Sequence, residues 1–204
     1  SENGTCATLH TMAVNGYGTA SPDTRLELNF YTGRVEVDGK YVTLDDGTPL
    51  QYMPLAVEQN LTASKYIETA GARMKKYEVD RTAYSDGRMP DNDIVLYRYA
   101  DVLLMKAEAK VRNGESGDEQ LNAVRSRAGM PSLAATLANI LDERLLELVW
   151  EGWRRQDMIR FGTYCEPYDI HTPSAADKKG YTIVFPIPEK ARELNPNLAQ
   201  NPGY

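Results

Sequence analysis

Residues 94–112 constrain the fold most, because they predict a helix that is apolar around much of its circumference. At 100° per residue, seven apolar side chains share one side: Leu96, Tyr97, Ala100, Leu103, Leu104, Ala107 and Val111. Val102, Met105 and Ala109 extend that surface. A helix of this kind packs against neighbours on more than one side, and Ala100 and Ala107 would allow one of them to approach closely. Asn113-Gly114 is a typical C-terminal stop.

A second helix is predicted at residues 118–128, where Leu121 and Val124 are apolar and Gly129-Met130-Pro131 ends the pattern. The two helices form a hairpin of roughly one tetratricopeptide-like unit of ~34 residues. A single unit of this kind cannot bury its faces alone. Its neighbours must therefore come from elsewhere in the protein.

The third predicted helix, residues 138–161, is the longest. Its charged side holds Glu143, Arg144, Glu147, Glu151, Arg154 and Arg155, and its apolar side holds Leu141, Leu145, Leu148, Val149 and Trp153. Buried charges need partners, since removing one partner of a buried pair costs roughly 3–5 kcal/mol. Pairs at i,i+3 and i,i+4 complete a predicted structural ion-pair network: Arg98, Asp101, Glu108, Glu147, Glu151, Arg154, Asp157 and Arg160.

The first ninety residues predict irregular loops with short strands. Alternating or β-branched stretches occur at 26–30, 34–37, 41–44 and 74–79, and Asp38-Gly39 and Asp46-Gly47 mark turns. Near the other end, residues 181–188 predict an edge strand or an extended strap, because two prolines exclude a central strand. The fold class is therefore α+β and mainly helical, with a loop-rich part at 1–90 and a helical part at 91–204 in one structural unit.

Charge and composition exclude several classes of function. The 204 residues carry a formal net charge of −6 and no long Lys/Arg cluster, which disfavours nucleic acid as a partner. No stretch approaches the ~18–20 apolar residues of a membrane span. The chain opens without a signal peptide, which indicates a cytoplasmic protein, a mature form or a fragment. Cys6 and Cys165 are compatible with a disulfide or with two free thiols.

No catalytic, metal or cofactor constellation is visible. His10 and His171 are the two histidines, which makes a Cys/His zinc site improbable, and the usual nucleotide-binding and nucleophile motifs are absent. Glu143, Glu147 and Glu151 are spaced at i,i+4 and resemble a glycosidase pair superficially. The arginines interleaved with them favour an ion-pair network, so an enzyme using this stripe is the alternative hypothesis.

Four blocks of the sequence resemble the SusD/RagB family, in the family's order. They are LYRYADVLLMKAEA at 96–109, LNAVRSRAG at 121–129, ERLLEL with EGWRRQDMIRFG at 143–162, and PIP with NPNLAQNPGY at 186–204. The resemblance covers roughly residues 73–204. It implies the C-terminal part of a SusD-like fold.

The family consists of cell-surface lipoproteins of Bacteroidetes that capture glycans, or in some members peptides, for nutrient uptake. The resemblance therefore implies a non-enzymatic binding protein for polysaccharide utilization that works with a SusC-like, TonB-dependent outer-membrane transporter. It implies an outer-membrane location through a lipid anchor that this chain lacks. Members are usually more than twice this long, so we expect this chain to be the C-terminal portion of a longer protein.

Ligand contacts in this family vary and lie in loops outside the shared motifs, which points to the tyrosine-rich first part. The candidate ligand-binding residues are Tyr17, Tyr31, Tyr41 and Tyr52. A tyrosine ring can stack on the apolar face of a sugar while its hydroxyl stays wet. Two alternatives remain: a peptide or glycoprotein ligand, and a transporter-docking scaffold whose ligand site lies in the missing N-terminal half.

Overall fold

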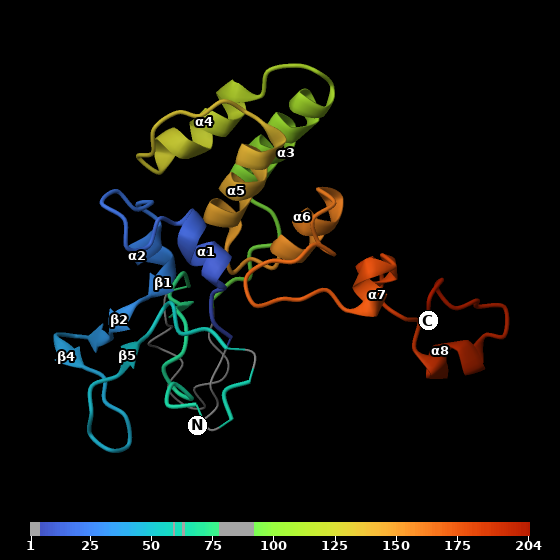
Figure 1. The fold of residues 1–204 in the computed structure, drawn as a ribbon. Helices are drawn as coiled ribbons and strands as arrows, with labels where there is room; N and C mark the ends of the chain where they lie inside the picture. Colours follow the sequence, from blue (N-terminus) through green and yellow to red (C-terminus); the bar gives the residue numbers. More distant parts are fainter. Residues whose placement is uncertain (1–4, 59, 63, 78–91) are drawn as a thin grey trace. The chain divides into compact units, whose positions relative to one another are not determined.

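A computed structural model describes residues 5–58, 60–62, 64–77 and 92–204, which divide into two compact units, Ser1–Arg154 and Arg155–Tyr204. Figure 1 shows the elements. The helices are α1 (Leu9–Val14), α2 (Leu26–Asn29), α3 (Tyr99–Arg112), α4 (Asp118–Arg127), α5 (Leu137–Leu148), α6 (Arg154–Arg160), α7 (Ala175–Lys178), the 3-10 helix η1 (Tyr181–Ile183) and α8 (Glu189–Leu194). The strands are β1 (Phe30–Tyr31), β2 (Gly33–Arg34), β3 (Glu36–Val37), β4 (Lys40–Tyr41), β5 (Gln51–Tyr52) and β6 (Arg73–Met74). The mainly helical α+β class predicted from the sequence is confirmed.

Helices α3, α4 and α5 pack together in the first unit (Figure 1). Leu104 and Ala107 of α3, Leu121 of α4 and Ile140 of α5 are fully buried. The predicted helix hairpin is confirmed: α3 ends at Arg112, Asn113 caps it, and Gly114 follows at φ +78°. That left-handed conformation costs glycine less than residues with a side chain. Within the part of the chain described, no helix is long and apolar enough to cross a membrane.

Helix α3 begins at Tyr99, five residues later than predicted. Arg98 is extended, with φ −145° and ψ 163°, and its guanidinium reaches Glu147 and Glu151. Leu96 and Tyr97 are 72% and 70% exposed, so the prediction that they share the buried side of this helix is wrong. The arginine contacts replace the first helical turn that the apolar spacing indicated.

The single long helix predicted at 138–161 is also wrong, because α5 ends at Leu148 and α6 begins at Arg154. Trp150 adopts φ +67° and Gly152 φ +81° between them. Such a conformation costs a tryptophan roughly 1–2 kcal/mol. The indole of Trp150 lies 5.6 Å from the Phe30 ring and donates to the Asn29 carbonyl at 2.9 Å, which offsets that cost.

The predicted strand at 26–30 is helical over its first four residues. Leu26 and Asn29 are buried while Leu28 is 67% exposed, a spacing of three that suits a helical turn rather than an alternating strand. Asp23 accepts from the backbone N–H of Arg25 at 2.9 Å, which turns the chain just before α2. Phe30 then leaves the helix and enters β1.

The other predicted strands exist but are short. The stretch at 34–37 is interrupted at Val35, which separates β2 from β3, and the stretch at 41–44 keeps Tyr41 in β4 and an isolated bridge at Thr43. Of 74–79, Met74 lies in β6, residues 75–77 are irregular, and 78–79 lie outside the described residues. The three pairs are antiparallel: β1 with β6, β2 with β5 and β3 with β4.

Both predicted turns are confirmed. Asp38 and Gly39 join β3 to β4 with φ of +53° and +73°, the two left-handed residues of a tight hairpin. At the second turn, Gly47 has φ +82° and Asp46 accepts from the backbone and hydroxyl of Thr48. The conformations and hydrogen bonds of the turn residues, rather than long strands, therefore determine the path of the chain in this region.

The core beneath the strands draws on distant parts of the first unit. It contains Ala7, Met12, Leu26, Phe30 and Ala72, with Tyr17, Val149 and Trp150 packed against it. Val149 and Trp150 come from the break after α5. The strand-bearing region, residues 26–76, is called the tyrosine lobe below.

The second unit contains no strand at residues 181–188, so of the two predicted alternatives the edge strand is wrong and the unpaired strap holds after η1. Residues Tyr181–Ile183 form η1, and Phe185–Pro188 is unpaired. Ile187 instead donates to and accepts from the Gln200 side chain, at 2.8 and 2.9 Å, while Tyr204 donates to the Val184 carbonyl at 2.8 Å. Because Pro186 and Pro188 lack backbone N–H groups, side chains of the C-terminal tail replace a strand partner.

The predicted division at residue 90 falls within 78–91, outside the described residues, and stays a prediction. It reflects a change in composition, whereas the compact units divide after Arg154.

Gly117 permits the close approach of α3 to the start of α4. A Cβ at this position would lie 2.6 Å from the Ala107 carbonyl oxygen. We expect Gly117→Ala to lower the free energy of unfolding by about 2–3 kcal/mol through overpacking, measured by urea denaturation. Gly114→Ala is the control. Its Cβ would meet nothing within 4 Å, so the expected loss of unfolding free energy is only that of alanine in a left-handed backbone conformation, ~1 kcal/mol. Equal losses would contradict the close-approach argument.

Candidate functional site

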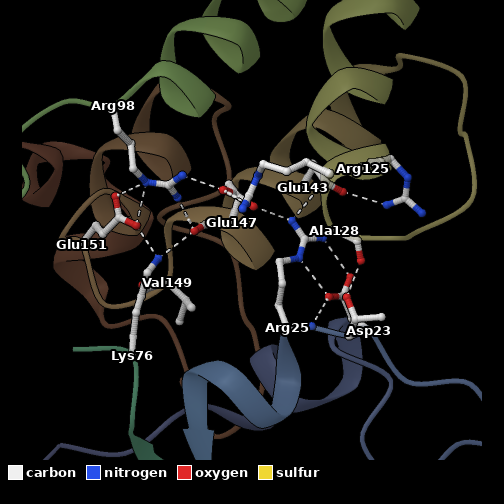
Figure 2. Close-up of polar contacts among 12 residues, drawn as sticks. Asp23, Arg25, Lys76, Arg98, Arg125, Ala128, Glu143, Glu147, Val149 and Glu151 are labelled. Carbon is white, nitrogen blue, oxygen red and sulfur yellow. Dashed lines mark hydrogen bonds and ion pairs between the residues drawn. The ribbon is translucent and has the colours of Figure 1, made fainter. Parts of the chain in front are cut away.

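A ladder of buried carboxylates runs along α5 and past its end (Figure 2). Glu143 and Glu147 lie on α5 and Glu151 follows in the break, with side chains only 1–2% exposed. Their partners come from other elements: Arg25 before α2, Lys76 after β6, Arg98 before α3, and Arg125 and Arg127 of α4. We call these side chains, together with Asp23, the carboxylate ladder.

Arg25 joins three carboxylates. Its Nε and Nη2 atoms donate to Asp23 at 2.9 and 2.8 Å, and Nη1 donates to Glu143 at 2.7 Å and to Glu147 at 2.8 Å. The planar guanidinium suits such forked contacts. The second oxygen of Glu143 accepts from Arg125 at 2.7 Å, so neither carboxylate oxygen of Glu143 is left without a donor.

The end of the ladder at Glu151 also caps the C-terminus of α5. Arg98 donates to the Glu147 carboxylate at 2.5 Å and to both oxygens of Glu151 at 2.9 and 3.0 Å. Lys76 pairs with Glu151 and donates to the backbone carbonyls of Glu147 and Val149 at 2.8 and 3.2 Å. These carbonyls lie at the helix end and would otherwise lack partners.

The partners recorded for Glu143, Glu147 and Glu151 come from other segments and not from the arginines interleaved with them, which corrects the sequence interpretation. Arg144 pairs with Asp101 at 2.7 Å, and Arg154 donates to the Leu141 carbonyl at 3.1 Å and contacts His10.

Two local pairs complete the predicted network. Glu108 pairs with Arg112 at 2.8 Å, at the predicted i,i+4 spacing, and Asp157 pairs with Arg160 at 2.9 Å. The expected pairing of Arg98 with Asp101 does not occur, since Arg98 turns toward the ladder and Arg144 holds Asp101.

The ladder favours the ionised form of two of its carboxylates, Glu147 and Asp23. Burial favours neutral Glu147, but hydrogen bonds from Arg98 and Arg25 outweigh it and lower the pKa of Glu147. Asp23 behaves alike: burial opposes ionisation, and Arg25 lowers its pKa. Burial also lowers the pKa of Lys76, an effect that Glu151 partly offsets.

This arrangement is poorly suited to acid-base catalysis. A catalytic acid needs a raised pKa and an open site, whereas Glu147 has a lowered pKa and contacts three cations. Asp23 and Glu143 border a pocket of about 250 Å³ that Asn15, Asp142 and Leu146 also line, but arginines hold both carboxylates. The ladder therefore supplies structure.

Cysteine and metal chemistry is equally limited in the described residues. Cys6 and Cys165 are free thiols. No group of three His, Cys, Asp or Glu side chains within the described ranges is placed to hold a metal ion.

The structure separates the four candidate tyrosines. Tyr17 packs against the core of the first unit, so its ring is a packing residue. Tyr31 lies in β1, Tyr41 in β4 and Tyr52 in β5, and Tyr41 is 53% exposed.

Tyr31 and Tyr52 belong to one cluster with two basic side chains. Tyr31 faces Arg73 across the β1–β6 pair, the guanidinium of Arg73 lies 5.3 Å from the Tyr52 ring centre, and Lys75 lies 5.6 Å from that of Tyr31. Tyr41 stands apart, with Arg34 at 5.5 Å.

Sequence reasoning missed five members of the ladder: Asp23, Arg25, Lys76, Arg125 and Arg127. Arg125 and Arg127 lie within the family-like block at 121–129, so the resemblance to the family could have pointed to them. Asp23, Arg25 and Lys76 lie in loop-like sequence with no periodicity, where nothing distinguishes a buried cation from a solvated one.

With this geometry established, comparison with known proteins identifies the family. The SusD family model matches residues 23–204, so the chain belongs to the SusD family. The resemblance inferred from residues 73–204 is confirmed, and the match extends into the tyrosine lobe.

Relatives support the same assignment. The chain is 30% identical to the starch-binding protein SusD of Bacteroides thetaiotaomicron over 65% of this chain, and 32% identical to the SusD-like protein P38 of Formosa agariphila over 56% of it. Each match spans 25% of the relative's own length. A solved SusD superfamily protein from Bacteroides vulgatus matches 97% of this chain and 44% of its own with a TM-score of 0.63 at 21% identity, which shows the fold alone.

The ladder predicts a large cost for removing its central cation. Arg25→Gln leaves Asp23, Glu143 and Glu147 short of a buried donor, so we expect the free energy of unfolding to fall by about 3–5 kcal/mol in urea denaturation. Arg34→Gln is the matched control, because this arginine is exposed and its recorded contact is with the Tyr41 ring, so its loss should cost at most ~1 kcal/mol. Similar losses would show that the ladder contributes no more than an exposed cation.

Stability should also fall in acid with a defined sign. The pKa values of Glu147 and Asp23 lie below their ordinary 4.5 and 3.8. Their contribution is therefore complete above pH ~4.5 and is lost as pH falls through the lower folded pKa values. We expect the urea midpoint to be level from pH 7 to 5 and to drop below pH 4. A midpoint that rises on acidification would contradict the ladder's charge state.

Proposed function

We propose that this chain forms part of a non-catalytic glycan-binding protein of a polysaccharide uptake system. Membership of the SusD family, with a starch-binding protein among its relatives, supports the class. The observation that carries the proposal within the chain is the set of tyrosine rings held on the lobe's strands, beside a ladder whose carboxylates are engaged by cations.

The tyrosine lobe suits carbohydrate better than catalysis. Tyr41 is largely exposed on a two-residue strand, and Tyr31 and Tyr52 share a cluster with Arg73. A sugar ring presents an apolar face for stacking on a phenol and hydroxyls for neighbouring polar groups. The strand pairs β1–β6, β2–β5 and β3–β4 carry Tyr31, Tyr52 and Tyr41.

The whole protein would deliver its glycan to a SusC-like, TonB-dependent transporter at the outer membrane, on the cell's outer face. The family resemblance supports this partner and location. The chain matches a quarter of its relatives' length, so a docking scaffold whose ligand site lies elsewhere, and a peptide ligand, are the competing functions.

Affinity electrophoresis tests the proposal. We expect one member of a panel of plant, host and microbial polysaccharides to retard the unaltered chain. The double variant Tyr31→Ala with Tyr41→Ala should abolish that retardation. Tyr99→Ala is the control, because this tyrosine is 74% exposed but lies on α3. If retardation survives loss of both lobe tyrosines, the site is elsewhere and the docking hypothesis is favoured.

A further inference from the structure

Every tyrosine between residues 26 and 76 has a basic side chain over its ring. The distances from cation to ring centre are 5.6 Å for Lys75 and Tyr31, 5.5 Å for Arg34 and Tyr41, 5.3 Å for Arg73 and Tyr52, and 4.9 Å for Lys65 and Tyr66. All lie within the ~6 Å over which a ring attracts a cation. By the same distance criterion, the other described residues hold three pairs, Arg155 with Tyr164 and with Phe185 and Arg160 with Phe161, so the pairs are concentrated in the lobe.

Three of these cations differ from those of the ladder, since no carboxylate of the described residues pairs with them. Arg34, Lys65 and Lys75 form no salt bridge with any residue in the described part of the chain, whereas each basic side chain of the ladder does. Lys75 donates to the Glu27 backbone carbonyl at 2.8 Å, which satisfies one of its N–H groups but leaves its charge. Arg34 and Lys75 are exposed.

We propose that the tyrosine lobe binds an acidic glycan, one whose sugar units carry a carboxylate or a sulfate. This inference rests on the proposed function and names its ligand class. A sugar ring lies against the part of the Tyr31 or Tyr41 ring that the cation leaves open, and its acidic group accepts hydrogen bonds from that cation, Lys75 or Arg34. A charge-assisted bond of this kind is about twice as strong as a neutral one.

Because the chain carries a net negative charge, binding of an acidic polysaccharide is a stringent test of the proposal. At −6 the chain repels a polyanion at long range. Retention by an acidic polysaccharide would therefore report a local site and not general attraction.

The experiment is native affinity electrophoresis of the chain in gels containing polygalacturonate, a sulfated carrageenan or neutral galactan. We expect retardation by polygalacturonate, by carrageenan or by both, none by galactan, and weaker retardation as salt rises from about 0.05 to 0.3 M. The double variant Arg34→Gln with Lys75→Gln should bind at least about tenfold more weakly. Lys106→Gln with Lys110→Gln removes the same charge from α3 and should leave retardation unchanged.

The outcomes separate the two proposals. One possible outcome is retardation by the neutral galactan. If Tyr31→Ala with Tyr41→Ala abolishes this retardation and Arg34→Gln with Lys75→Gln leaves it intact, the acidic ligand is overturned while glycan binding stands. Equal weakening by the lobe and α3 charge variants overturns the lobe cations as the contact. No retardation by these polymers or by the wider panel overturns both proposals.

Discussion

The charge on the buried Glu147 carboxylate has to be compensated by protein groups rather than by water, and separate segments of the first unit supply the cations. Three arginines from three separate segments, Arg25, Arg98 and Arg127, converge on this carboxylate. An uncompensated buried charge costs several kcal/mol, so these segments can be displaced only together. The ladder is thus a long-range constraint that links residues more than a hundred positions apart.

This constraint also positions the tyrosine lobe. Arg25 stands directly before α2 and β1, and Lys76 follows β6 by two residues. Both ladder cations therefore flank the β1–β6 pair that carries Tyr31 and Arg73. A two-residue strand pair has little stability of its own, so its geometry depends on these flanking ion pairs and on Phe30 packing against Trp150.

The sequence predicts helices and turns well where local chemistry decides them. The α3–α4 hairpin follows from periodicity and from the stops at Gly114 and Gly129, and the tight turn at Asp38-Gly39 from its residue types. The failures share a cause: Arg98, Leu26 and Trp150 take conformations that tertiary contacts impose. Periodicity continues through residue 153, but α5 ends at Leu148, where Lys76 and Arg98 both donate to the Glu147 carbonyl.

The candidate site divides in the same way. That Glu147 and Glu151 belong to ion pairs is evident from charge on an apolar helix, but the identity of the partners is not, since Arg25 and Lys76 lie in segments without a pattern. Likewise, tyrosine content points to the lobe, while the separation of Tyr17, a core residue, from Tyr41, an exposed one, requires the fold.

Amide hydrogen exchange of Glu147→Gln, followed by mass spectrometry under native conditions, tests most directly whether the ladder couples the lobe to the helices. The account predicts that protection falls together in the last turn of α5, in β1 and in β6, by about tenfold or more, because Arg25 before β1 loses an acceptor and Arg98, which shares Glu151 with Lys76 after β6, loses another. A loss of protection confined to α5, with the lobe unchanged, would contradict it.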